Sequence, residues 1–250
     1  MSDKRLLIRV YGDSLGMPRA DSGVRFDQTY SELFCAWLRT VRSDAQVHLY
    51  NRSQGGASIR KLFQEYQMDS IYFGKPGGDI LVLQLGIVDC APRPIPTWVK
   101  FLIGRLPSPL RTPIVKFLHR FRPNLLRMGC KWRSTSRSAF SRLFQKWLQR
   151  AANDFARIYV VSVMPTTPEI EARSPGLGES AVSCNQDIEA AILSSGAANI
   201  HFIDAHRIAA ENPDEVSRFV DASDGHHLTA EGHRLLSGLL IQNEKRFASP

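Results

Sequence analysis

The stretch Leu6-Leu7-Ile8-Arg9-Val10-Tyr11-Gly12-Asp13-Ser14-Leu15-Gly16 joins an apolar run to a turn flanked by glycines. Its first five residues are mostly aliphatic and predict a short buried β-strand. Glycine and aspartate favour tight turns, so the strand should end near Gly12 and present Ser14 just beyond it. In α/β sheets the ligand site lies beyond the carboxyl ends of the strands, and Ser14 is therefore a candidate site residue.

Further apolar runs, with helical patterns between them, follow at 47–50, 80–85, 158–163 and 200–203. Parallel strands need crossover connections, so this alternation predicts a parallel sheet with helices on both faces. We expect a three-layer α/β/α sandwich with a flavodoxin-like sheet of five strands. Residues 1–250 are interpreted as one domain, and its last helix should run from about Ala230 to Glu244.

The composition is that of an ordinary soluble globular protein, with 43% hydrophobic and 22% charged residues. No apolar stretch approaches the roughly 18 residues that a membrane-spanning helix needs. The first apolar run is too short for a secretory signal, so we expect a cytoplasmic protein, with peripheral membrane association as an option. The four cysteines lack the spacing of metal ligands, and neither a metal nor a cofactor is expected.

Chemically distinctive residues follow later strands as well. Gly55 and Gly56 come after the second apolar run, and glycines allow backbone N–H groups to approach a ligand closely. The segment 86–89 follows the third run, and 224–227 precedes the last helix. Together with Ser14, the imidazoles and carboxylates of these segments are the parts needed for acyl transfer through a covalent ester.

The blocks 12–15, 56, 86–89 and 224–227 resemble the SGNH/GDSL hydrolase superfamily of esterases, lipases and carbohydrate acetylesterases. The resemblance extends over most of the chain, and the blocks occur in the family's order. It implies that Ser14 is the nucleophile, His227 the general base and Asp224 the carboxylate that orients the imidazole. It also implies that the backbone N–H groups of Ser14 and Gly56 form the oxyanion hole.

The third block departs from the family pattern, which usually reads Gly-x-Asn-Asp. Val88 stands where the asparagine is expected, and a valine side chain cannot donate a hydrogen bond. Loss of one oxyanion donor typically lowers turnover by roughly 100- to 1000-fold. Gln84 and Arg93 are candidates for a substitute donor. If neither replaces it, catalysis is slow or has been lost.

Other residues compete for two of these roles. His226 is adjacent to His227, and the Asp-x-x-His spacing favours His227 as the base. His233 lies within the predicted last helix and is interpreted as structural. Asp221 is an alternative to Asp224 as the orienting acid.

Residues 95–150 contain 13 Lys and Arg and no Asp or Glu, whereas the remainder of the chain is net acidic. Prolines at 92, 94 and 96 predict an extended lead-in, and apolar stripes at 114–125 and 140–155 predict two amphipathic helices. We expect a basic helical insertion over 91–153. It is either a cap packed on the body or a lid that also contacts an anionic membrane or a polyanionic glycan. No nucleic-acid module is recognised, so nucleic acid is not an expected partner.

The sequence therefore predicts a serine esterase or acylhydrolase acting on an acylated lipid or carbohydrate. One alternative is an O-acyltransferase that uses the same serine and passes the acyl group to a glycan hydroxyl. Another is a non-catalytic glycan- or membrane-binding relative, which the valine at position 88 and the basic segment would suit. An intact Ser14, Asp224 and His227 favours the enzyme.

Overall fold

The computed structural model describes residues 4–20, 23–72, 78–211, 216–221, 223 and 225–248. Its centre is one parallel sheet of five strands in the order β2-β1-β3-β4-β5, formed by β1 (Lys4–Gly12), β2 (Ala45–Asn51), β3 (Gly78–Gln84), β4 (Phe155–Val161) and β5 (Ile200–Ile203). This is the flavodoxin-like order. The strands are added toward one edge of the sheet with β2 and toward the other edge from β3 onward, so the switch point lies between β1 and β3. The predicted fold class is therefore confirmed.

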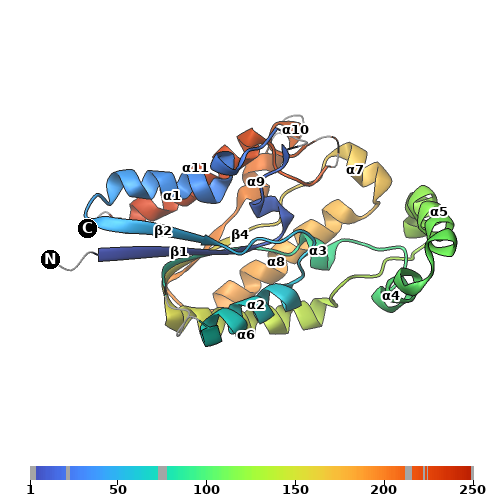
Figure 1. Cartoon of the computed structure of the whole chain (residues 1–250), viewed down its shortest axis with the longest axis horizontal. Coiled ribbons are helices and arrows are strands. Elements are labelled where there is room, and N and C mark those ends of the chain that lie inside the picture. The colour runs from blue at the N-terminus through green and yellow to red at the C-terminus, as the bar shows by residue number, and fades with distance from the viewer. Residues whose placement is uncertain are drawn as a thin grey trace.

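Helices cover both faces of the sheet (Figure 1). On one face α1 (Tyr30–Val41) packs against α11 (Ala230–Ala248), which is longer than predicted. The other face carries α2 (Ile59–Tyr72), α6 (Arg137–Asp154) and α8 (Leu177–Ser195). The short helices are η1 (Ser14–Gly16), η3 (Phe26–Gln28), α3 (Ile87–Cys90), α7 (Pro168–Arg173), α9 (Ala205–Ala210) and α10 (Val216–Phe219).

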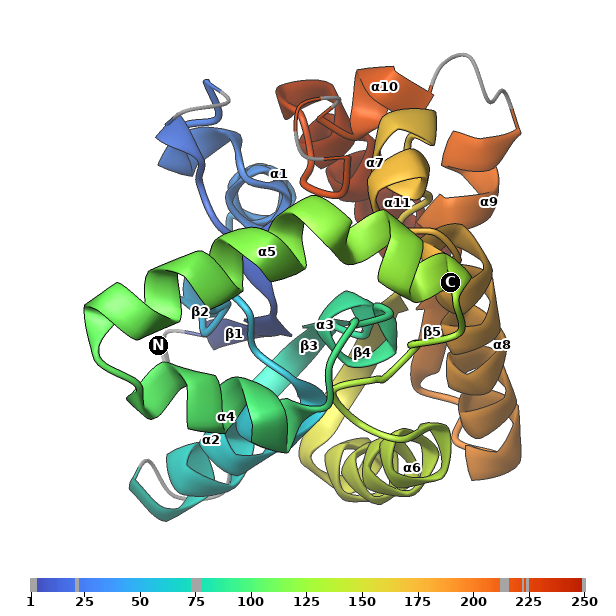
Figure 2. The same cartoon turned by 90° about the vertical axis from the view of Figure 1, so that its right-hand side faces the viewer.

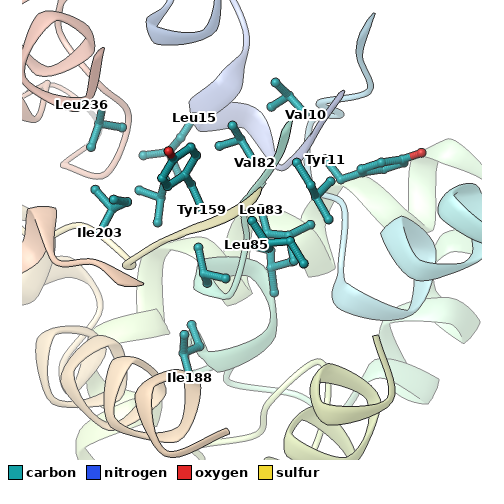
Figure 3. Close-up of a cluster of buried hydrophobic side chains, with 14 of the residues drawn as sticks. Val10, Tyr11, Leu15, Val82, Leu83, Leu85, Tyr159, Ile188, Ile203 and Leu236 are labelled. Carbon is teal, nitrogen blue, oxygen red and sulfur yellow. The ribbon is translucent and has the colours of Figure 1, made fainter. Parts of the chain in front are cut away.

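The core lies on both faces of the central strands (Figure 3). Val10 and Tyr11 are adjacent in β1 and point to opposite faces, because side chains alternate along a strand. Both are fully buried. The Tyr11 ring packs edge to face against Tyr66 and Trp147, at centroid distances of 5.6 and 5.8 Å. This aromatic cluster joins β1 to α2 and α6.

Helix α6 belongs to the sandwich. It packs against α8, α2 and β4, and its apolar stripe, including Phe144, Trp147 and Leu148, is fully buried. The insertion expected over 91–153 includes this stripe, whereas the structure packs α6 on the sheet face between β3 and β4. The physical reason is topological, because a right-handed crossover between the parallel strands β3 and β4 requires a helix on the sheet face, and α6 supplies it.

Two helices, α4 (Thr97–Arg105) and α5 (Ser108–Arg127), lie beyond the carboxyl ends of the strands (Figures 1 and 2). We call them the α4–α5 cap. Helix α4 is not predicted from the sequence, where the three prolines before it indicate extended chain. The only fully buried residue of α5 is Leu126 among the described side chains. The predicted apolar stripe at 114–125 is thus largely solvent-exposed.

We predict that two tryptophan substitutions separate the sandwich from the cap. Trp147→Ala should lower the free energy of unfolding by about 3–5 kcal/mol, because it opens a cavity in the aromatic cluster. Trp98→Ala removes a side chain that is 66% exposed on α4, so its effect should be within about 0.5 kcal/mol. Urea denaturation followed by circular dichroism measures both. Equal losses would contradict the assignment of α6 to the sandwich.

Candidate active site

The turn after β1 presents Ser14 at the edge of the sheet. The Asp13 N–H donates to the Gln84 carbonyl (3.1 Å), and the Asp13 carboxylate accepts the Leu15 N–H (3.0 Å). The residue that opens a helix has no carbonyl acceptor within that helix for its N–H. Ser14 is the first residue of η1, so its N–H donates none of the backbone hydrogen bonds within that helix.

Ser14 and His227 are 213 positions apart in the sequence and lie in contact in the folded chain. His227 lies in the loop between α10 and α11, and only 9% of its surface is exposed. Its Nε2 atom is 2.7 Å from the Ser14 Oγ atom, which is hydrogen-bonding distance. A serine and an imidazole in this contact have the geometry of a nucleophile and its base.

Arg19, which no sequence motif singles out, also contacts His227. Its Nη1 atom is 2.5 Å from Nδ1 of the imidazole. A guanidinium only donates hydrogen bonds, so it can bond to Nδ1 only in the tautomer that carries the ring proton on Nε2. Nε2 can accept the serine proton only when Nδ1 carries its own proton. A His227 that serves as the base would therefore have Nδ1 paired with an acceptor group and not with Arg19.

Beside Ser14 lies an open cavity of about 570 Å³ at the carboxyl ends of the strands. Gly56 lines it and has a φ of +68°, a left-handed conformation that suits glycine. Val88 also lines the cavity, where the family pattern has an asparagine. His119 and Arg122 reach it from α5, so the cap forms one wall of the site.

The expected substitute donors lie elsewhere. Gln84 is 2% exposed, and its side chain packs beside Gly12 and Asp13 beneath the turn. Arg93 donates to the Val88 carbonyl (3.1 Å) and lines a neighbouring cavity under the cap. Neither residue is part of the described lining of the Ser14 cavity. The role of substitute donor stays a prediction for both residues.

The remaining histidines and acids have distinct surroundings. His226 lines the cavity, with its ring centroid 4.1 Å from that of His227. His233 is 1% exposed and its Nδ1 accepts the Tyr30 N–H (3.1 Å), a structural contact. Asp221 accepts the Ser223 N–H (2.8 Å) and so shapes the turn before His227. Asp224 lies outside the described residues, and its role stays a prediction.

Burial raises the pKa of the Asp13 carboxyl to about 7, although the hydrogen bonds from Leu15 and Gln84 partly oppose the shift. Burial also raises the pKa of Asp89. The Asp89 carboxylate accepts the Ile59 N–H (2.8 Å) and the Thr135 hydroxyl (2.5 Å). Asp89 thereby fixes the first turn of α2 and the entry to α6 against α3.

Solved structures of lipases and esterases, some of them of GDSL type, share the fold of this chain. The similarity covers 96% of this chain and 95% of the lipase/acylhydrolase from Enterococcus faecalis, at a TM-score of 0.64 and 13% identity. The similarity to the acetylxylan esterase from Geobacillus stearothermophilus covers 96% of this chain and 93% of that chain, at a TM-score of 0.59 and 13% identity.

A member of the lipolytic G-D-S-L family from Veillonella parvula is similar over 95% of this chain and 97% of that chain, at a TM-score of 0.57 and 14% identity. No protein-family model matches the sequence, and no curated protein matches it. The fold of GDSL-type lipases and esterases is thus established by structure. At these identities the likeness establishes the fold alone.

We predict that Asp13→Asn stabilises the protein increasingly as the pH rises. A carboxyl with a raised pKa contributes stability that is present below its unfolded pKa and lost as the pH rises through about 7. The asparagine keeps the acceptor for the Leu15 N–H and avoids a buried charge. Its melting temperature should exceed that of the wild type by more at pH 8 than at pH 5. Asp44→Asn, on an exposed side chain, is the control. A pH-independent difference would contradict the raised pKa.

Proposed function

We propose that the protein is a serine esterase that cleaves an acyl or acetyl ester of a lipid or carbohydrate through an acyl-enzyme on Ser14. The observation that carries the proposal is the 2.7 Å contact between Ser14 Oγ and His227 Nε2 at the wall of an open cavity. The acyl substrates named for the fold's solved relatives support the same class of reaction.

The proposed chemistry begins when Ser14 Oγ attacks the ester carbonyl and its proton passes to His227 Nε2. The tetrahedral intermediate collapses, the bond to the alcohol oxygen breaks, and the imidazolium returns the proton to the leaving alkoxide. A water molecule then attacks the acyl-serine and gives its proton to His227. The second collapse releases the acid and regenerates the serine hydroxyl. Asp224 is proposed to accept a hydrogen bond from the Nδ1–H of the imidazole in both stages and to stabilise the imidazolium.

The proposed oxyanion hole consists of the backbone N–H groups of Ser14 and Gly56. Val88 adds no donor, so this hole has one side-chain hydrogen bond fewer than the family pattern implies. The energetic consequence falls on the transition state, where the negative charge develops. We therefore expect slow turnover on unactivated esters and faster turnover on activated ones, whose leaving groups need less stabilisation.

Transfer of the acyl group to a sugar hydroxyl is the alternative outcome of the same acyl-enzyme. The open cavity leaves space for an acceptor as well as for water. A purely binding role is favoured less, because it requires no serine–imidazole contact.

A fluorophosphonate probe tests the nucleophile. We expect covalent labelling of Ser14 in the wild type, identified by mass spectrometry of the labelled peptide. Ser14→Ala should abolish both labelling and hydrolysis of p-nitrophenyl acetate. His227→Ala should lower kcat by at least about 100-fold, the contribution of a general base.

His226→Ala is the matched control for His227→Ala, because both rings line the cavity and they are adjacent in the sequence. It should retain a substantial fraction of the wild-type kcat. A greater loss in His226→Ala would transfer the role of base to His226. Undiminished labelling of Ser14→Ala would overturn the nucleophile assignment.

We also propose that the α4–α5 cap rests on an anionic lipid surface. Eight large apolar side chains on its two helices are between 37% and 66% exposed: Trp98, Phe101, Leu102, Leu110, Ile114, Val115, Phe117 and Phe121. Exposed apolar groups at this density mark interaction sites, and basic residues such as Lys116 and Arg120 surround them. Among the described residues no helix is long and apolar enough to cross a bilayer, so contact would be interfacial.

Two charge reversals with the same spacing and the same change in net charge test this surface. We expect Lys116→Glu/Arg120→Glu, on α5, to abolish sedimentation with anionic phospholipid vesicles. Arg142→Glu/Lys146→Glu, on α6 of the sandwich, should preserve it. Wild-type binding should weaken between 0.05 and 0.5 M salt, because screening shortens the reach of the attraction. Equal binding to zwitterionic vesicles, or equal loss in both variants, would contradict the proposal.

A further inference from the structure

Three arginines gather around the Ser14 cavity without a carboxylate partner among the described residues. Arg122 and Arg173 line the cavity, and Arg93 lines the adjoining cavity of about 240 Å³ between α4 and α5. Arg122 lines both cavities and so stands at their junction. No Asp or Glu occurs among the described residues that line either space. The cluster therefore gives this part of the cleft a net positive charge.

The arginines are held in place by neutral acceptors. Arg122 donates from Nη2 to the Pro92 carbonyl (2.8 Å) and to the Ser174 hydroxyl (2.9 Å). Arg173 donates to the Ser223 carbonyl (3.2 Å). These bonds orient the two guanidinium groups, and neutral acceptors do not cancel their positive charge.

Arg93 is fixed most firmly. Its backbone pairs with Trp132 in both directions (2.7 and 2.9 Å), and its Nη2 donates to the Val88 carbonyl. Its Nε is buried and has no hydrogen-bond partner in the described part of the chain. A buried N–H without a partner is costly, and the cost is recovered if a ligand supplies an acceptor. Asp89 is the nearby carboxylate, and it is already engaged by Ile59 and Thr135.

Like charges packed this closely oppose one another. Burial lowers the pKa of Arg122, and the neighbouring charges of Arg93 and Arg173 lower it further. Such a cluster costs free energy in the empty protein, and an anion would offset the cost. Planar guanidinium groups suit carboxylate and phosphate oxygens, which they bind through paired hydrogen bonds.

We propose that this cluster is an anion subsite of the active-site cleft, and that the substrate ester carries a carboxylate or phosphate group which Arg122 binds with help from Arg93 and Arg173. This inference rests on the proposed function, because it places the anionic group on the ester that Ser14 attacks. It narrows the substrate to anionic esters. It also assigns Arg122 as a specificity-determining residue.

Matched acetyl esters test the subsite. The neutral ester is 4-acetoxybenzamide, and the anionic esters are 4-acetoxybenzoate and 4-acetoxyphenyl phosphate, which distinguish the two kinds of anion. In the wild type, kcat/KM should be roughly ten-fold or more higher for at least one anionic ester, the range of a hydrogen bond to a charged group. Arg122→Gln should bring the ratio of kcat/KM for the anionic ester to kcat/KM for the neutral ester close to one. Arg122→Lys should restore part of the preference for the anionic ester. Arg127→Gln, on the exposed last turn of α5, should leave the ratio at its wild-type value.

Direct binding separates this inference from the proposed function. Calorimetry with benzoate and phenyl phosphate should detect binding to the wild type and to Ser14→Ala. Arg173→Gln should lower the affinity for the anion at least ten-fold. The Arg173 side chain is exposed, so this replacement should leave the fold intact. Hydrolysis of all three esters at equal kcat/KM, with no anion binding, would overturn the proposed anion subsite and support the proposed esterase activity. Anion binding that Arg122→Gln abolishes, without hydrolysis of any ester, would retain the subsite and refute the esterase.

Discussion

The site depends on the close packing of the turn after β1 against the loop after β2. The strand register pairs Gly12 with Gln84, and a Cβ atom at Gly12 would lie only 2.9 Å from the Ser53 hydroxyl. A Cβ at Gly16 would collide with the same side chain. Glycine at both positions therefore lets the two loops meet, so that Ser14 and Gly56 share one cavity. Larger residues would separate the nucleophile turn from the proposed oxyanion donor.

The sheet could be predicted from local signals, whereas the pairing of Ser14 with His227 was implied by the resemblance of their sequence blocks to a known family. Apolar runs locate buried strands, and the serine and histidine occur in blocks whose order matches a known pattern. The extent of the cap could not be predicted in this way. Helix α6 and the exposed α5 have similar amphipathic patterns, and only the crossover requirement of β3 and β4 identifies α6 as part of the sandwich.

Residues that line the site through contacts distant in the sequence belong to no recognisable sequence motif. Arg19 reaches His227 across 208 positions, and Arg122 reaches Ser174 across 52. In the sequence each is one arginine among the 32 Lys and Arg residues of a basic chain. Periodicity reports which face of a helix is apolar, but it does not report which cation on that face turns inward. Only the three-dimensional arrangement separates Arg122 from exposed neighbours such as Arg120.

The two unusual features of the cleft have opposite electrostatic effects. Val88 offers no side-chain donor at the wall of the cavity, where the family pattern has an asparagine. The arginine cluster supplies positive charge nearby, and it acts through space as well as through hydrogen bonds. A positive potential near the proposed oxyanion hole would favour an oxyanion more than the neutral ester from which it forms. An anionic substrate group bound to the cluster would neutralise part of that potential, so the gain in binding would be partly offset in the transition state.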